Sequence, residues 1–158
     1  MPLVVELATD PYIPLIGSLH AAAGAEEARA WIQRQHGRFG EGIGLSFAIA
    51  DAASDTAVGT IGLWLQELSA GRATAGYSVS PAHRGRGIAS SALQALTEFA
   101  WTIPELFRIE LHIEPWNTGS IHVAESAGYR REGLLRSFQE IGGVRCDMLL
   151  YAATRPEG

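Results

Sequence analysis

The stretch Gly76-Tyr-Ser-Val-Ser-Pro-Ala-His-Arg-Gly-Arg-Gly-Ile-Ala-Ser-Ser91 determines how the surrounding chain can fold. It combines the end of an apolar strand, a turn rich in glycine, and the first turn of a helix. Glycines allow a backbone to approach a ligand closely, and a helix N-terminus offers unpaired N–H groups and a favourable dipole. The stretch therefore predicts a phosphate-binding turn, although an ordinary strand-to-helix connection can also carry glycines and a surface arginine.

The composition is typical of one globular domain. The chain has 158 residues, of which 47% are hydrophobic and 18% are charged, and this is enough to bury a core. We therefore expect a single domain over residues 1–158. The formal net charge of -5 argues against nonspecific binding of nucleic acids, which requires a basic face.

Cysteine usage and hydropathy limit the compartment and the chemistry. Cys146 is the single cysteine, which excludes a disulfide within the chain and gives no metal-ligand spacing. No apolar run approaches the roughly 20 residues of a membrane span, and the N-terminus lacks the features of a signal peptide. We expect a cytoplasmic protein that uses no metal and does not bind membranes.

Hydrophobic periodicity predicts a helix, a three-strand meander, and then a helix, a strand, a helix and a hairpin. The expected helices cover residues 25–36, 87–101 and 117–127, and the expected strands cover residues 45–50, 57–65, 73–80, 108–114, 129–135 and 144–151. Residues 1–7 fit either an edge strand or the tail of a helix. A meander followed by crossovers predicts a mixed, mostly antiparallel sheet in an α+β domain with helices on both faces.

Two motifs carry a resemblance to a known family. Arg84-Gly-Arg-Gly-Ile-Ala89 fits the R-x-x-G-x-G/A turn of the GNAT superfamily of N-acetyltransferases, and a Val-x-Pro precedes it at residues 79–81. Asn117-x-x-Ser120, followed by Val123-Ala-Glu-Ser-Ala-Gly-Tyr129, is similar to the second signature of the RimJ/RimL-like branch. Competing phosphate motifs fail, because no Gly-Lys-Ser/Thr and no third glycine with a ribose-binding acid is present.

The resemblance implies that acetyl-CoA is the cosubstrate. It places the pyrophosphate on the backbone of Arg84, Gly85, Arg86, Gly87, Ile88 and Ala89, and it pairs the pantetheine arm with the strand that ends at Val79. Asn117 and Ser120 complete the expected cofactor side of the site. Backbone amides near Val79 would polarise the thioester carbonyl, because the sheet of this superfamily opens there.

Ser120 is the candidate that would hydrogen-bond to the thiol of the cofactor, as the resemblance to the RimJ/RimL-like branch implies. The alternative is an ordinary serine in a first helical turn, whose hydroxyl satisfies helix amides. Other GNAT branches carry a tyrosine that acts as the general acid seven residues after the asparagine, and Ala124 occupies that position here.

His112 and Glu110 are the candidates for the general base, with Glu114 on the same strand face. A histidine titrates near pH 6.5, and some relatives that acetylate protein N-termini place a glutamate at the position of His112. The neighbouring glutamates are expected to favour the imidazolium and to raise the pKa of His112. The alternative is a solvated polar face without a catalytic role.

These features together predict an N-acetyltransferase that moves acetyl from acetyl-CoA to a primary amine by direct attack in a ternary complex. Protein N-termini, polyamines, amino acids and antibiotic amines all remain open as acceptors. The rival hypothesis is a noncatalytic acyl-CoA-binding module. Relatives usually place a strand and a helix before the segment at Asp10-Pro11, where nine residues stand here. A homodimer is one way to protect the sheet edge.

Overall fold

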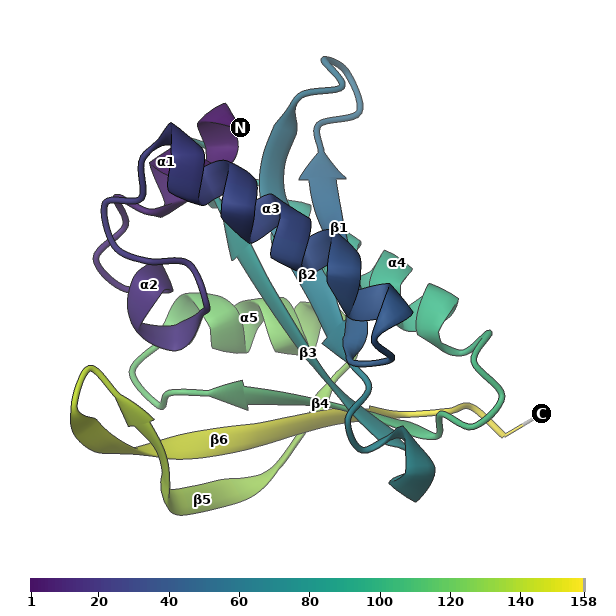
Figure 1. Cartoon of the computed structure of the whole chain (residues 1–158). Coiled ribbons are helices and arrows are strands. Elements are labelled where there is room, and N and C mark those ends of the chain that lie inside the picture. Colours follow the sequence, from purple (N-terminus) through teal and green to yellow (C-terminus); the bar gives the residue numbers. More distant parts are fainter. Residues whose placement is uncertain (158) are drawn as a thin grey trace.

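The computed structural model describes residues 1–157, which form a six-stranded sheet with helices around it (Figure 1). The helices are α1 (Pro2–Leu7), α2 (Ile13–Ile16), α3 (Ala25–Gly40), α4 (Ile88–Ala100) and α5 (Thr118–Ser126). The strands are β1 (Gly44–Ala50), β2 (Ala57–Trp64), β3 (Arg72–Val79), β4 (Arg108–Ile113), β5 (Arg130–Ile141) and β6 (Val144–Thr154). The strand order β1-β2-β3-β4-β6-β5 is antiparallel except between β3 and β4, so the predicted mixed sheet is confirmed.

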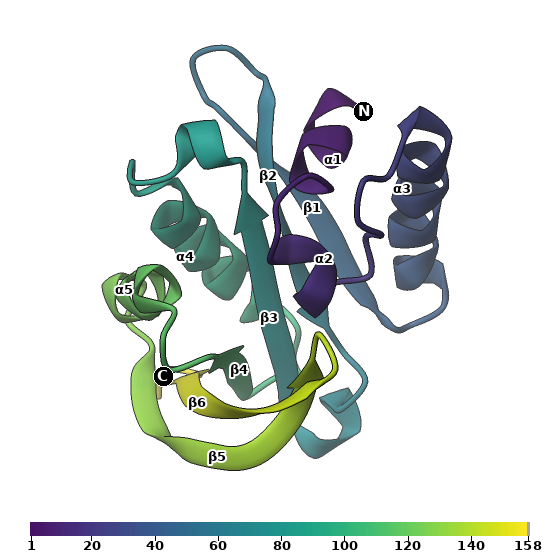
Figure 2. The same cartoon turned by 90° about the vertical axis from the view of Figure 1, so that its left-hand side faces the viewer.

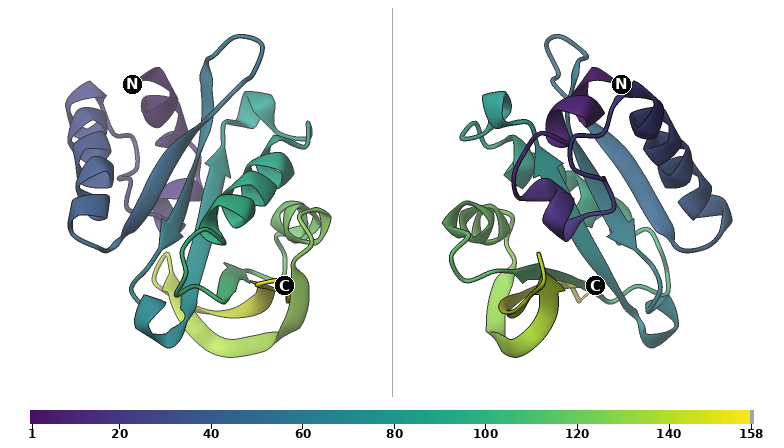
Figure 3. Two further views of the ribbon diagram at one scale, coloured as in Figure 1. Left: turned by 90° about the vertical axis from the view of Figure 1, so that its right-hand side faces the viewer. Right: turned by 60° about the vertical axis from the view of Figure 1, so that its left-hand side comes forward.

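The sheet lies between two helical layers, as the α+β prediction requires. Figure 2 shows α4 and α5 on one face and α1, α2 and α3 on the other, and the left panel of Figure 3 agrees. The main core fills the space under α4 and α5, where Leu63, Leu93 and Ile109 are fully buried. A second apolar cluster, which includes Leu7 and Ala28, holds α1 and α3 together.

The one parallel strand pair, β3 with β4, is short. Pairing covers Arg72–Thr74 against Arg108–Glu110 and then stops. Beyond this point the two strands fan apart, as Figure 1 shows. The sheet is therefore split between the second half of β3 and the end of β4, and backbone groups of β3 that face the split have no ladder partner on β4.

The structure resolves one open alternative at the N-terminus and corrects one predicted helix end. The first residues form helix α1, in which Pro2 occupies the first turn, where its missing N–H costs nothing. The prediction that the next long helix ends at His36 is wrong, because α3 continues through Gly37 to Gly40. The left-handed residue that terminates it is Gly42, with φ of 69°.

Candidate active site

The glycine-rich turn has the backbone geometry that its sequence predicts. Gly85 and Gly87 both adopt left-handed conformations, with φ of 72° and 74°. No atom lies within 4 Å of the position that a Cβ would take at either residue. Glycine is therefore required here for its conformation, and the space above the turn is open.

The turn and the start of α4 present a continuous row of backbone donors. Within residues 1–157, the amides of residues 85–90 donate no hydrogen bond, and the first bond of the helix runs from Ser91 N to Gly87 O at 3.0 Å. Gly87 is the N-cap of α4 and offers no side-chain cap. Free amides at the positive end of a 13-residue helix form a site for an anion such as a pyrophosphate.

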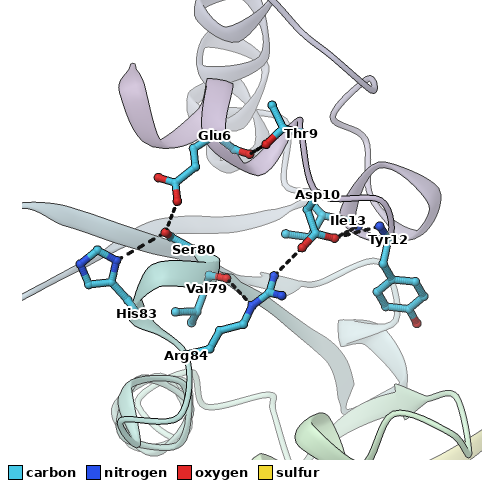
Figure 4. Close-up of polar contacts among 9 residues, drawn as sticks. All are labelled: Glu6, Thr9, Asp10, Tyr12, Ile13, Val79, Ser80, His83 and Arg84. Carbon is cyan, nitrogen blue, oxygen red and sulfur yellow. Dashed lines mark hydrogen bonds and ion pairs between the residues drawn. The ribbon is translucent and has the colours of Figure 1, made fainter.

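Arg84 makes three hydrogen bonds to other parts of the protein. Its amide donates to Pro81 O at 3.3 Å, its Nε donates to Val79 O at 3.0 Å, and its Nη2 donates to Asp10 Oδ2 at 2.7 Å. Figure 4 shows the contacts of Arg84 with Val79 and Asp10. Arg84 therefore ties the turn to β3 and to the segment before α2, and its amide is occupied within the protein. Arg86 is exposed and makes no ion pair within the described residues.

Asp10 is the buried end of this tie. Its Oδ1 accepts from the amides of Tyr12 and Ile13 at 2.8 and 3.0 Å, which starts α2. Burial raises the pKa of Asp10, but the bonds from Arg84 and from the two amides outweigh burial and hold that pKa below its ordinary value. The N-terminal segment is thus fixed against the end of β3.

A second set of contacts strengthens the same junction (Figure 4). The hydroxyl of Ser80, which is fully buried, donates to the carboxylate of Glu6 in α1. His83 Nδ1 lies 3.4 Å from the same hydroxyl. The histidine beside the glycine turn therefore belongs to this structural network.

The free edge of β3 faces the split in the sheet. Ser80 N donates to Val58 O at 2.9 Å, so this residue points toward β2. Backbone groups alternate in direction along a strand, and those of Tyr77 and Val79 therefore point into the split. The carbonyl of Val79 accepts from Arg84, which leaves its N–H as a donor toward the gap.

Ser120 and Asn117 lie across the split from β3, on α5. Asn117 is the N-cap, and its Oδ1 accepts from Ser120 N at 3.1 Å, so the predicted cap is confirmed. The hydroxyl of Tyr77 donates to Ser120 O at 3.3 Å, which connects β3 to α5. Within residues 1–157 the Ser120 hydroxyl has no hydrogen-bond partner, so it caps no helix amide.

His112 lies two residues beyond the last β3–β4 pair. Its Nε2 is 3.6 Å from Glu110 Oε2, and the ring packs on Phe138 with a centroid distance of 4.8 Å. Burial lowers the pKa of His112 below 6.5, and this outweighs the opposing charges of Glu110 and Glu67. The expectation of a raised pKa is therefore wrong. Glu110 is itself paired with Arg108 Nε at 2.6 Å, which weakens its influence.

Glu114 directly follows the last residue of β4 and contacts the segment before α2. It is buried and accepts from the Tyr12 hydroxyl at 2.5 Å. Burial and the neighbouring Glu114 raise the pKa of Tyr12. The ring of Tyr12 also contacts Trp116 edge-on, with centroids 5.0 Å apart. Tyr12 and Trp116 were not predicted as parts of the site, because only the fold brings residue 12 to the end of β4.

The strand register separates the candidate groups onto two faces. Trp64 pairs with Thr74 and Thr74 pairs with Glu110, so the three side chains share one face. His112, two residues after Glu110, projects to that same face, over which α1, α2 and α3 lie. Ser120 lies on the other face with α5. A group held in the split would have the carboxylate and imidazole on one side and the hydroxyl on the other.

Residues 2–130 match the family model described as Acetyltransferase (GNAT) domain. The chain belongs to the GNAT acetyltransferases. A protein of Bacillus licheniformis named uncharacterized N-acetyltransferase p20 is 32% identical over 149 residues, which cover 94% of this chain and 84% of that protein. The prediction of an N-acetyltransferase is confirmed.

Solved structures agree with the family. Mycobacterium smegmatis RimJ, in complex with CoA-disulfide, is 29% identical with a TM-score of 0.73, and the match covers 82% of this chain and 61% of that one. RimL, a ribosomal L7/L12 alpha-N-protein acetyltransferase in complex with coenzyme A, has a TM-score of 0.83 at 21% identity, covering 97% and 85%. The expected GNAT fold and the likeness to the RimJ/RimL branch are confirmed. No helix within residues 1–157 is long and apolar enough to cross a membrane.

Proposed function

We propose that this GNAT protein binds acetyl-CoA across the split between β3 and β4 and transfers the acetyl group to a primary amine. The observation that carries the proposal is the position of the free amides relative to the exposed edge of β3. The row of free amides at residues 85–90 follows the strand whose edge the split exposes, after one short 3₁₀ helix at Pro81–His83. The pyrophosphate oxygens would accept hydrogen bonds from these amides, and the pantetheine arm would extend along Tyr77 and Val79. Mycobacterium smegmatis RimJ, a relative of known structure, was crystallised with CoA-disulfide, which supports the assignment.

The residues around the split suit a direct transfer in a ternary complex. The bound thioester supplies an electrophilic carbonyl carbon, and the Val79 N–H that points into the split would polarise the carbonyl oxygen. The amine nitrogen forms the new bond to that carbon, and the carbon–sulfur bond breaks. The amine must lose a proton and the thiolate must gain one.

Two residues would handle these protons from opposite faces. His112, whose pKa is lowered by burial, is neutral at physiological pH and can accept the proton of the amine directly or through a water. Glu110, 3.6 Å from His112, would orient it. Ser120, whose hydroxyl has no partner within the described residues, would donate to the thiolate on the α5 side.

The comparisons leave the acceptor open within the class of amines. RimL is a ribosomal L7/L12 alpha-N-protein acetyltransferase, so the acceptor of that relative is a ribosomal protein. Protein N-termini and small-molecule amines both fit the reaction. The homodimer, the absence of nucleic-acid binding and the cytoplasmic location stay predictions.

The assignment of residues 85–90 to pyrophosphate binding is tested by calorimetric titration of CoA into a Gly87→Asp variant. We expect CoA binding to be abolished, because the new carboxylate would meet the pyrophosphate. Gly42→Asp is the matched control, since Gly42 has a similar φ of 69° and equally open surroundings at the far end of α3. It adds the same charge and the same backbone strain, and it should bind CoA normally. Unchanged affinity in folded Gly87→Asp would refute the assignment.

A further inference from the structure

A cavity of about 330 Å³ lies between the sheet face of β1–β3 and the helices α1, α2 and α3. The right panel of Figure 3 shows these helices over that face. Most of its wall is apolar, with Leu7, Ile13 and Trp31 among the contributors. The cavity reaches β3 at residues 76–78, the part of the strand that borders the split. It therefore opens next to the place where acetyl transfer is proposed.

The ring of Trp64 forms the floor of the cavity near the split. A Cβ on Gly62 would lie 2.8 Å from this ring, and a Cβ on Gly76 would lie 3.4 Å from it. The ring therefore lies over both glycines and extends from β2 onto β3. Glycine at position 62 is needed for this arrangement, because a side chain there would overlap the ring.

Arg38 supplies positive charge to this apolar wall. Its guanidinium lies 5.3 Å from the centre of the Trp64 ring, and its Nη2 donates to Ser18 Oγ at 3.3 Å. Within residues 1–157 no carboxylate lies within ion-pair distance of it. Burial, and then the charge of Arg34, lower the pKa of Arg38. A half-buried guanidinium without a carboxylate is suited to bind an anionic group of a ligand.

Gln35 lies one helical turn before Arg38, so both side chains lie on the same side of α3. Only 8% of Gln35 is exposed. Its Oε1 accepts from Ser46 Oγ at 3.1 Å, whereas Nε2 has no partner within the described residues. A buried amide donor is costly to leave unpaired, so this atom also indicates an absent acceptor. Gln35 and Arg38 both line the cavity.

The same sheet face carries Glu110 at the closed end of the split, where its carboxylate is paired with Arg108. Trp64, Thr74 and Glu110 form one cross-strand row, so the carboxylate of Glu110 lies two strands from the Trp64 ring. A ligand in the cavity would meet the Arg38 guanidinium at one end and the open part of the split, next to residues 76–78, at the other. This arrangement complements a molecule with an anionic group at one end and a reactive amine at the other, because the amine must reach the split for acetyl transfer.

We propose that the cavity binds the acceptor, and that the acceptor is an amino carboxylate with an apolar body between its charged groups. The carboxylate lies on Arg38 and Gln35, the body lies on Trp64, and the primary amine points past Gly76 into the split. The inference rests on the proposed transferase function. Arg38 lies over Trp64, which pairs with Thr74. The strand rises by about 7 Å from Thr74 to Gly76 and by about 13 Å from Thr74 to Ser78, so we expect the carboxylate and the amine to be about 7–13 Å apart.

The test compares two acceptor series of matched length. The first contains straight-chain amino carboxylates from ω-aminobutanoate to ω-aminooctanoate, and the second contains the alkylamines that lack the carboxylate. Thiol release from acetyl-CoA gives kcat/KM for each. We expect the wild type to favour the best amino carboxylate by about tenfold or more, as one charge-assisted hydrogen bond would provide. Arg38→Leu should lower kcat/KM for the amino carboxylates and so remove this preference. Arg29→Leu, an exposed position on the same helix, should keep it.

A binding measurement separates failure of this inference from failure of the proposed function. Hexanoate, which has no amine, is titrated against the fluorescence of Trp31 and Trp64, both of which line the cavity. We expect a saturable change in the wild type that Arg38→Leu abolishes. Equal kcat/KM for the two series, or a preference that survives Arg38→Leu, would overturn the acceptor class. If no amine is acetylated, the proposed function fails, and the hexanoate titration alone decides whether Arg38 binds carboxylates.

Discussion

A substitution at Ser120 can distinguish a catalytic role from a helix-capping role. Asn117 caps the amide of Ser120, and the Ser120 hydroxyl has no partner within residues 1–157. We predict that Ser120→Ala lowers kcat about 10²-fold, since the thiolate would lose its proton donor. The affinity for CoA should stay nearly intact, and the melting temperature should change by less than about 2 °C. Steady-state kinetics and thermal unfolding measure both effects.

Ser126→Ala, on the last turn of the same helix, is the matched control and should retain full activity. A Ser120→Ala variant with normal kcat and a lowered melting temperature would show that Ser120 has only a structural role.

His112 predicts a particular pH dependence of turnover. Burial lowers the pKa of His112 below 6.5, so a limb in kcat that reports its protonation should fall on the acid side of pH 6.5. Activity would be lost as the pH falls through that pKa, because the imidazolium cannot accept a proton. The limb should disappear in His112→Ala. The pH profile of kcat at saturating substrates is the measurement.

Two neighbours of His112 should move this limb in opposite directions. Phe138→Ala removes the ring that covers the imidazole, so less burial should raise the pKa of His112 and shift the limb to higher pH. Glu110→Gln removes a charge that raises this pKa, so the limb should shift to lower pH. Identical profiles in the wild type and His112→Ala would exclude His112 as the base.

The sequence predicts these residues better than it predicts their surroundings. Ser120, Asn117 and the glycine turn are marked by short motifs, and the structure keeps them in one region. The direction of the His112 pKa could not be predicted, because the covering Phe138 comes from a strand that is distant in the chain. Charge can be counted from sequence, whereas burial depends on the fold.

Among the elements, the tie between the glycine turn and the N-terminal segment should contribute to stability. Arg84→Met removes the bonds to Asp10 and Val79, and we expect a loss of about 1–3 kcal/mol in the free energy of unfolding. Arg86→Met alters the same turn without breaking an ion pair and should cost little. Urea denaturation of both variants measures the difference.

The same tie should depend on pH in a defined direction. Because the folded-state pKa of Asp10 is lowered, its contribution is fully present above the ordinary value of 3.8 and is lost as the pH falls through the folded value. The stability difference between the wild type and Arg84→Met should therefore shrink in strong acid. A difference that stays constant below pH 3.8 would contradict the assigned role of the pair.

Periodicity predicts most helices and strands but not how they meet. The alternation at residues 108–114 and the helical spacing after Gly87 are confirmed as β4 and α4. Residues 1–7 were too few for periodicity to decide, and the burial of Leu3, Val4 and Leu7 on α3 favours the helix. The split between β3 and β4 follows from strand directions in the assembled sheet, which no local pattern encodes.

At the scale of the molecule, the two helical layers contribute different groups to the split between β3 and β4. The layer of α4 and α5 provides the amide row and Ser120, and the layer of α1, α2 and α3 covers the face with His112 and the cavity. Contacts between Asp10 and Arg84 span 74 residues and hold the layers in register. We therefore expect residues 1–157 to unfold as a single domain.

The central claim is that this arrangement is a working acetyltransferase and not a passive binder of acyl-CoA. It is tested most directly by incubating the wild type with acetyl-CoA and a panel of primary amines, including ω-amino carboxylates, polyamines and peptides with free N-termini. Thiol release and the mass of the amine product are followed together. We predict that at least one amine is acetylated in proportion to the thiol released, well above background hydrolysis. Tight binding of acetyl-CoA without an acetylated product from any amine would contradict the claim.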